Sequence, residues 1–332
     1  MGKPFAGING FGRFGLGLFR AWFEDCDAAY SIAFINDDVL TIGAIADILK
    51  HDPVVTAFDG LEITSENNTL RIYRRDKTFV ETKVTTGPLE DSHWLGLPAI
   101  IFDCSSRALN FTKYAKILLG DTRVVLIGAI TAAADATLIM GFNETDYNEQ
   151  ANRVISFGSC TVIPGVHVIN IVQSTAGVKN VLVNVVHSVP KWQLDARGLK
   201  TIVRKRCTLE SVVPTLIKSI SPGNIKVNYT YAPYHGVSLM DFAFTLDQPI
   251  SKPQFISSLK HHVSQGRLNE IIGLVDEDTG AAEHKHSTRS ISIIESSIDV
   301  REDKVYFFGY FNNEGSGVRL HELSNYVVRS WH

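Results

Sequence analysis

Cysteine is scarce in this chain, and its few copies are widely spaced. The 332 residues include four, at Cys26, Cys104, Cys160 and Cys207. Since no two of them form a C-x-x-C pair, the spacing excludes a disulfide framework and the common zinc motifs. Free thiols are typical of proteins in a reducing compartment. We therefore expect no metal site, and packing roles for Cys104 and Cys207. The alternative for Cys207, which precedes Thr208, is a position near an active site.

The sequence also lacks long apolar runs and an excess of either charge. No apolar stretch approaches the ~20 residues that span a membrane, and residues 4–8 resemble a strand rather than part of a signal peptide. The formal net charge is -3, which gives no basis for general binding to nucleic acid or to an acidic membrane surface. We expect a cytoplasmic protein that has neither a nucleic acid nor a membrane as its partner.

Strand and helix signals alternate in the first half of the chain. The alternation favours a doubly wound, mostly parallel sheet, which is the α/β Rossmann arrangement. Polar and apolar residues also alternate over residues 61–84, which predicts an antiparallel insertion. The expected elements are strands at 5–9, 30–36, 99–103 and 123–127, and helices after residue 15, at 41–50 and near 111–119.

Long β-type runs dominate the second half of the chain and predict an α+β domain on a mainly antiparallel sheet. We expect residues 1–158 to form a nucleotide-binding domain and residues 159–317 a catalytic domain. The last segment, residues 318–332, has the pattern of a helix that packs back on the first domain. The expected strands of the second half lie at 180–186, 225–231, 237–246, 291–296 and 304–310, with helices at 209–219 and 253–264.

A glycine-rich loop, Gly10–Gly15, follows the first strand and precedes an apolar helix. In this context the glycines let the backbone approach a pyrophosphate, which the helix N-terminus attracts. Asp37 ends the second strand, where a carboxylate can bind ribose hydroxyls. Asp37 and Asp38 together would repel a 2′-phosphate, so the sequence favours NAD over NADP. The alternative is a tight structural turn with a surface acidic pair. The cofactor-binding residues expected in this part are Gly10, Phe11, Gly12, Arg13, Phe14 and Asp37.

Cys160 and His187 are the candidate catalytic pair. We expect Ser159 to cap a helix that begins at Cys160, so that the helix terminus and a nearby imidazole lower the pKa of the thiol. A thiolate can attack an aldehyde, and His187 can move the hydroxyl proton while hydride leaves for NAD, which yields a thioester. The alternative is a buried cysteine and a core histidine without a shared function.

The chain resembles the phosphorylating glyceraldehyde-3-phosphate dehydrogenase family. Residues 7–15 are very similar to the opening signature of that family, and residues 35–37 are similar to its ribose-binding strand end. Residues 159–161, Ser-Cys-Thr, resemble its catalytic segment, and residues 187–193 resemble the segment that carries its base. The resemblance implies that Asn313 contacts the nicotinamide carboxamide.

This sequence departs from the family mainly at the positions with which members of the family recognise the phosphate of their substrate. Pro190 and Trp192 stand where the family has two threonines, and Tyr231 stands where it has an arginine. Loss of an arginine removes a bidentate cation suited to phosphate, whereas Trp192 and Tyr231 offer aromatic walls. A loop after Gln193, which contacts a neighbouring subunit in the family, is about ten residues shorter. The resemblance implies a homo-oligomer, either a dimer or a tetramer, and the shortened loop favours the dimer over the tetramer that is usual in the family.

A second anion site resembles the one that holds inorganic phosphate in the family. Ser159, Thr161 and Thr208 match its residues, although Leu209 replaces an expected glycine. Arg206, beside Thr208, is a further candidate to hold an anion. The sequence thus predicts oxidation of a small aldehyde by NAD, with inorganic phosphate as a candidate acceptor. The alternative function is an NAD-binding, non-catalytic homologue that acts as a sensor or an interaction protein.

Overall fold

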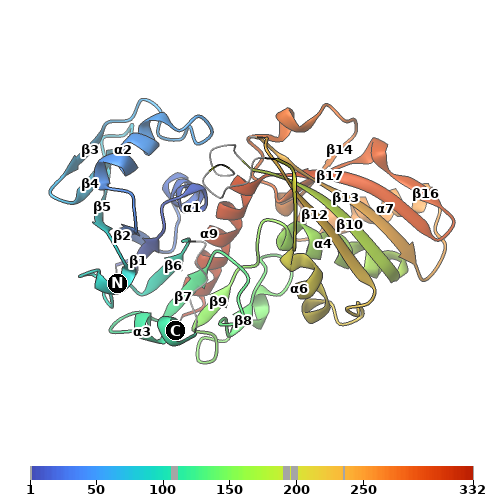
Figure 1. Ribbon diagram of the computed structural model, residues 1–332, viewed down its shortest axis with the longest axis horizontal. Helices are drawn as coiled ribbons and strands as arrows, with labels where there is room; N and C mark the ends of the chain where they lie inside the picture. Colours follow the sequence, from blue (N-terminus) through green and yellow to red (C-terminus); the bar gives the residue numbers. More distant parts are fainter. Residues whose placement is uncertain (1, 106–110, 190–194, 196–200, 235, 332) are drawn as a thin grey trace. The chain divides into compact units, whose positions relative to one another are not determined.

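The computed structural model of the chain describes residues 2–105, 111–189, 195, 201–234 and 236–331. The chain divides into two compact units, which Figure 1 draws from blue to red along the sequence. Unit 1 comprises Met1–Ser159 and Ser316–His332, and unit 2 comprises Cys160–Gly315. The boundaries expected from the sequence lie within one or two residues of these divisions. The assignment of a separate function to each part remains a prediction.

Unit 1 contains sheet A, whose strand order is β3-β4-β5-β2-β1-β6-β7-β9-β8. Neighbours from β5 to β8 along this order pair in parallel, which confirms the predicted doubly wound α/β arrangement. The predicted insertion forms the antiparallel β3-β4-β5 edge. The strands are β1 (Phe5–Asn9), β2 (Ser31–Asp37), β3 (Ile63–Glu66), β4 (Thr69–Tyr73), β5 (Phe79–Thr86), β6 (Ile100–Asp103), β7 (Val124–Ile127), β8 (Ala136–Thr137) and β9 (Val154–Ser156). The helices of this part are α1 (Arg13–Glu24), α2 (Ile42–His51), α3 (Phe111–Ile117) and α9 (Asn313–Arg329).

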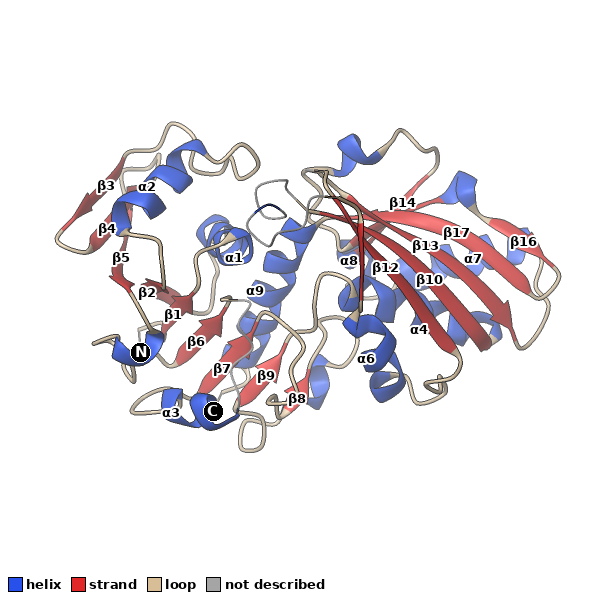
Figure 2. Cartoon of the chain, in the orientation of Figure 1, coloured by secondary structure: helices blue, strands red, loops and turns tan. Residues whose placement is uncertain are grey.

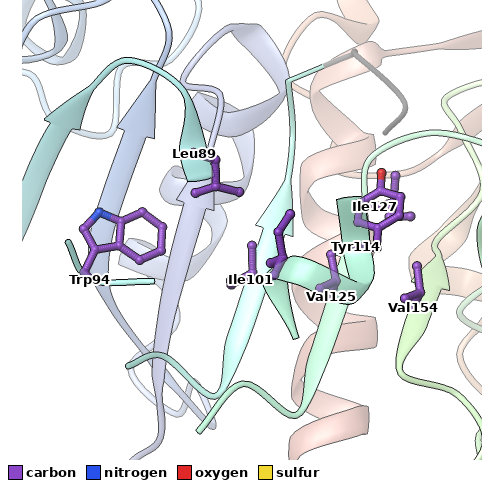
Figure 3. Packing of buried hydrophobic residues seen from close by; sticks show 8 residues of the cluster. Leu89, Trp94, Ile101, Tyr114, Val125, Ile127 and Val154 are labelled. Atoms are coloured by element: carbon purple, nitrogen blue, oxygen red, sulfur yellow. The ribbon is translucent and has the colours of Figure 1, made fainter. Parts of the chain in front are cut away.

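Helices cover both faces of sheet A, because its central strands are apolar on both sides. On one face, Trp94 and Tyr114 pack with side chains of β6, β7 and β9, including Ile101 (Figure 3). On the other face, the ring of Tyr30 lies 5.4 Å from that of Phe102. The Tyr30 hydroxyl is 2.7 Å from Nδ1 of His321 in α9. Consecutive strand residues point to opposite faces, so α3 and α9 lie on opposite sides of the sheet.

Unit 2 contains sheet B, whose strand order is β11-β12-β10-β13-β17-β15-β14, with β16 paired to β17. Apart from the parallel pairs β10–β12 and β14–β15, neighbours are antiparallel, which confirms the predicted mainly antiparallel sheet. Its strands are β10 (Val178–Ser188), β11 (Val203–Lys205), β12 (Ile225–Ala232), β13 (Ser238–Leu246), β14 (Ile272–Val275), β15 (Ile291–Ile294), β16 (Asp299–Arg301) and β17 (Lys304–Phe311). Its α-helices are α4 (Val162–Ala176), α6 (Thr208–Leu216), α7 (Lys252–Val263) and α8 (Leu268–Ile271).

The long strands of sheet B bury one face and leave the other partly exposed. Along β13, buried residues alternate with half-buried ones from Ser238 to Leu246, as expected for a strand with one face against a core. Helices α4, α6 and α7 pack on the buried face (Figure 2). Val183, Val185 and Phe242 belong to this face and are almost fully buried. The face therefore provides a rigid support for the side chains at the ends of β10, β12 and β17.

Two kinds of feature are absent from the described ranges: a cluster of metal-binding side chains and a helix suited to crossing a membrane. No group of three or more histidine, cysteine, aspartate or glutamate side chains is placed there to hold a metal ion. None of the helices found there combines the length and apolar character that crossing a bilayer requires.

Candidate active site

His187 lies near the end of β10, among aromatic side chains supplied by neighbouring strands. Its register partner on β12 is Tyr231, so the two side chains share a face of sheet B. The imidazole centroid lies 5.6 Å from the ring of Tyr231, 5.6 Å from that of Tyr229 and 5.9 Å from that of Phe311. The half-buried His187 is thus bordered by aromatic rings from β12 and β17.

The thiol of Cys160 faces this histidine. Sγ of Cys160 lies 3.5 Å from Nε2 of His187, although 27 residues separate the two in the sequence. Cys160 is half-buried, and it occupies the turn that leads into α4. The predicted pair of thiol and imidazole is therefore within contact distance. Its catalytic role is taken up below as a proposal.

The start of helix α4 differs from the expectation. The helix begins at Val162, and its N-cap position is Thr161, whose side chain makes no capping hydrogen bond, so the N-cap is not Ser159. Pro164 explains the difference, because proline lacks an N–H and fits only the first turn of a helix. A helix that began at Cys160 would need the N–H of residue 164 for a hydrogen bond. The signal was present in the sequence and was missed.

The pKa of the Cys160 thiol also departs from the expectation. Burial of the thiol and the nearby charge of Cys207 raise it to about 12, while backbone N–H groups of Thr161 and Cys160 oppose the increase. The predicted lowering of the pKa is therefore wrong, because desolvation disfavours the thiolate more than the turn stabilises it. A thiol of this kind stays protonated at neutral pH. To act as a nucleophile it needs a base within reach, and Nε2 of His187 is placed to receive its proton.

Cys207 is a second thiol in the same region. Its Sγ lies 3.4 Å from Oγ1 of Thr161, the residue after Cys160. Cys207 is half-buried, it is the N-cap of α6, and burial raises the pKa of its thiol. The two cysteines thus precede helices α4 and α6, which pack together. The packing role predicted for Cys207 misses this contact with Thr161.

The residues expected to bind anions lie around the same two helix starts. Thr208 is the first residue of α6 and is exposed, as is Arg206 two positions earlier. Leu209, noted above as an unexpected residue, is fully buried against α4. A Cβ atom on Gly165 would lie 2.6 Å from the Leu209 side chain, so this glycine makes room for it. Trp192 and the side chain of Asn313 lie outside the part of the chain that the structure describes.

The glycine loop of unit 1 has the local geometry of a phosphate cradle. Gly10 adopts a φ of +92°, and a Cβ atom there would lie 2.6 Å from the backbone of Ser105, so only glycine fits. Gly12 is the N-cap of α1 and has no atom within 4 Å of the place where its Cβ would be. Open space therefore lies at the start of this helix. The residues present fit a dinucleotide, because N–H groups at a helix N-terminus attract phosphate.

Asp37 is held at the carboxyl end of β2, beside the glycine loop. Its Oδ2 accepts a hydrogen bond of 2.7 Å from the backbone N–H of Phe11. Its Oδ1 accepts hydrogen bonds of 2.9 Å from the N–H groups of Val39 and Leu40. These contacts fix the carboxylate in one orientation, where a bound ribose could share it. This is the position from which the acid of such a site binds a ribose.

Three other loop residues contact the protein itself. Phe11 is almost fully buried and packs 5.6 Å from the ring of Phe19, so its side chain belongs to the core. Phe14 packs 5.1 Å from Phe157, and Arg13 forms an ion pair with Asp52. The ring of Phe11 is therefore part of the core, and its backbone N–H is the group that holds Asp37.

Comparison with known proteins gives matches over almost the whole chain. Residues 159–308 match the family model described as the glyceraldehyde 3-phosphate dehydrogenase, C-terminal domain. The chain is 27% identical to glyceraldehyde-3-phosphate dehydrogenase of Geobacillus stearothermophilus, over 97% of each chain. It is 26% identical to glyceraldehyde-3-phosphate dehydrogenase 1 of Bacillus cereus, over 97% of this chain and 98% of the relative. The cytosolic glyceraldehyde-3-phosphate dehydrogenase of Chlamydomonas reinhardtii is 24% identical over 99% of this chain.

Proposed function

Since the chain is a divergent relative of the glyceraldehyde-3-phosphate dehydrogenase family, we propose that it is an NAD-dependent dehydrogenase that oxidises an aldehyde through a thioester on Cys160. The observation that carries the proposal is the 3.5 Å contact between Sγ of Cys160 and Nε2 of His187. A neutral, half-buried thiol beside an imidazole has the nucleophile and the base that a covalent mechanism requires.

The first step forms a bond between Sγ of Cys160 and the aldehyde carbon. The thiol proton passes to Nε2 of His187, which then protonates the oxygen that was the carbonyl oxygen, and a hemithioacetal results. In the second step the C–H bond breaks with its electron pair, and His187 withdraws the hydroxyl proton, which leaves a thioester. NAD, when bound, accepts that hydride. Attack by the acceptor oxygen on the thioester carbon then breaks the C–S bond and frees Cys160, whose thiolate is reprotonated.

NAD is the proposed cofactor, and its proposed site is built by Gly10, Phe11, Gly12, Arg13, Phe14 and Asp37. Support comes from the open space at Gly12 and from the oriented carboxylate of Asp37. A negative charge at Asp37 opposes a 2′-phosphate, so NADP should bind more weakly. Asn313 is proposed to contact the nicotinamide carboxamide, on the basis of the family resemblance alone.

Inorganic phosphate is the proposed acceptor, held by Ser159, Thr161, Thr208 and Arg206. The exposed Thr208 and Arg206 at the start of α6 support this assignment, since hydroxyls, a guanidinium and a helix N-terminus suit a dianion. The substrate site is proposed to differ from that of the family, with Tyr231 and Trp192 as aromatic walls. A homo-oligomer, as a dimer or a tetramer, and a cytoplasmic location complete the proposal.

The test is NADH formation from glyceraldehyde 3-phosphate and from a panel of other aldehydes, with and without inorganic phosphate. A rate on the order of 1–10³ per second that requires phosphate would support the whole proposal. Cys160→Ser should abolish it, whereas the matched control Cys26→Ser, at an exposed cysteine, should not.

The alternative function is an NAD-binding protein without useful catalysis, such as a sensor. The raised pKa of the Cys160 thiol favours this alternative, because a thiol that stays protonated is a poor nucleophile on its own. NAD binding with no NADH formed from any aldehyde would establish this alternative and refute the dehydrogenase.

A further inference from the structure

Tyr229 is a buried residue that the proposed mechanism does not use. It lies two positions before Tyr231 on β12, so both side chains point to the same face of sheet B. Their rings form an edge-to-face pair with centroids 5.3 Å apart. Each ring also lies 5.6 Å from the imidazole of His187. The proposed base therefore has one side bordered by a continuous wall of two tyrosines.

This wall consists of two aromatic rings, each of which carries a hydroxyl group. Tyr229 is only 8% exposed. Burial first, and then the charges that Cys160, Tyr231 and Cys207 would carry when ionised, raise the pKa of its hydroxyl. The hydroxyl therefore stays protonated throughout the pH range in which proteins work. On the other side of His187, Phe311 adds a third ring at 5.9 Å.

Within the described residues, the cation of the neighbouring edge strand that shares the face of this wall is Lys205. Lys205 is the register partner of Tyr229 on the edge strand β11 and is exposed. The order β11-β12-β10 places Tyr229 and Tyr231 between Lys205 and the strand that carries His187. The rings of Tyr229 and Tyr231 supply no cation themselves, so a substrate phosphate that lies against them would lose water without compensation from the wall, which is unfavourable. An apolar group would gain from the same contact.

We propose that Tyr229 and Tyr231 select aldehydes in which the group next to the carbonyl carbon is apolar, with an aromatic ring as the best fit. The inference rests on the proposed function, because it concerns the substrate that Cys160 and His187 oxidise. Aromatic rings prefer edge-to-face and offset contacts with one another, which a tyrosine pair offers from two directions. Tyr231 is half-buried and faces the substrate, whereas Tyr229 is a positioning residue that supports its ring.

The experiment compares kcat/KM for 3-phenylpropanal, propanal and glyceraldehyde 3-phosphate at saturating NAD. Wild type should prefer 3-phenylpropanal to propanal, and propanal to the phosphorylated aldehyde, each by about 10-fold or more. Tyr231→Arg should reverse the order of the charged and uncharged substrates. Tyr229→Ala should lower kcat/KM for 3-phenylpropanal about 10-fold more than kcat/KM for propanal, whereas Tyr229→Phe, which keeps the ring, should preserve the wild-type ratio between the two substrates.

The outcomes separate this inference from the proposed function. Turnover of glyceraldehyde 3-phosphate that exceeds that of both uncharged aldehydes would overturn the aromatic selection and leave the dehydrogenase intact. Absence of NADH from every aldehyde would refute the dehydrogenase itself. The ranking by the wild-type protein decides the matter without any variant. Circular dichroism and NAD binding verify that each variant is folded before its ranking is used.

Discussion

The Cys160 thiol should react slowly with alkylating agents at neutral pH, in contrast to a thiol that a helix terminus activates. An ordinary thiol with a pKa of about 8.5 is about 3% thiolate at pH 7. With its pKa at about 12, Cys160 would have a thiolate fraction on the order of 10⁻⁵ at that pH. A thiolate of higher pKa is intrinsically more nucleophilic, and this raises the alkylation rate of each ionised Cys160 about 40-fold over that of an ordinary thiolate. The net expectation is alkylation about 10²-fold slower than that of an ordinary thiol.

The assay is iodoacetamide labelling of the intact protein at several pH values, followed by peptide mass spectrometry. Cys26 is exposed and provides an internal reference in the same sample. The ratio of Cys160 to Cys26 labelling should be low at pH 7, and the Cys160 rate should still rise at pH 10. Labelling after denaturation controls for accessibility, because both thiols should then react alike. A Cys160 rate that exceeds that of Cys26 and levels off below pH 8 would refute the reasoning and indicate a preformed thiolate–imidazolium pair.

Three further predictions concern other parts of the molecule. Cys207→Ser should shift the alkylation profile of Cys160 to lower pH, because serine can still accept a hydrogen bond from Thr161 but carries no charge; an unchanged profile would contradict the coupling. Gly12→Ala should weaken NAD binding without lowering the Tm, since the new Cβ atom meets open space. Gly10→Ala should cost about 1–3 kcal/mol of stability, because Gly10 has a positive φ and its Cβ atom would touch the backbone. Equal effects of the two substitutions on the Tm would contradict this interpretation of the loop. Burial lowers the pKa of His321, so its contribution to stability is complete above its ordinary pKa of about 6.5 and is lost as the pH falls toward the lowered value. Urea unfolding of wild type should therefore show a decline between pH 7.5 and 5.5 that His321→Asn reduces, and parallel declines would exclude His321 as the cause.

The elements near the glycine loop could be predicted because their signals are local. The strand expected at residues 5–9 is β1, and the helix expected at 41–50 is α2, displaced by one residue at each end. Apolar periodicity within a short window is sufficient for this. The start of helix α4 differs from the expectation based on Ser159, because Pro164 imposes a stronger constraint on where the helix can begin. Helix α9 begins at Asn313, five residues earlier than expected.

The chemistry of the candidate site followed from the sequence only in part. A cysteine and a histidine could be named, but their contact depends on where α4 and β10 meet in the fold. Tyr229 could have been noticed, since it shares the period of two with Tyr231 on a predicted strand. The sequence could not show that both tyrosines face His187, because the register between β10 and β12 joins residues more than 40 positions apart.

The sequence by itself determined the order of strands and helices, the glycine loop with its acid, and the presence of a thiol and an imidazole. Hydrophobic periodicity and the conformational demands of glycine and proline act over a few residues, so one sequence is enough to read them. Only the tertiary structure decided the pKa of Cys160, the contact between Thr161 and Cys207, and the tyrosine wall beside His187. Burial and cross-strand register depend on which distant segments pack together, and desolvation of the thiol therefore arises only when the chain has folded.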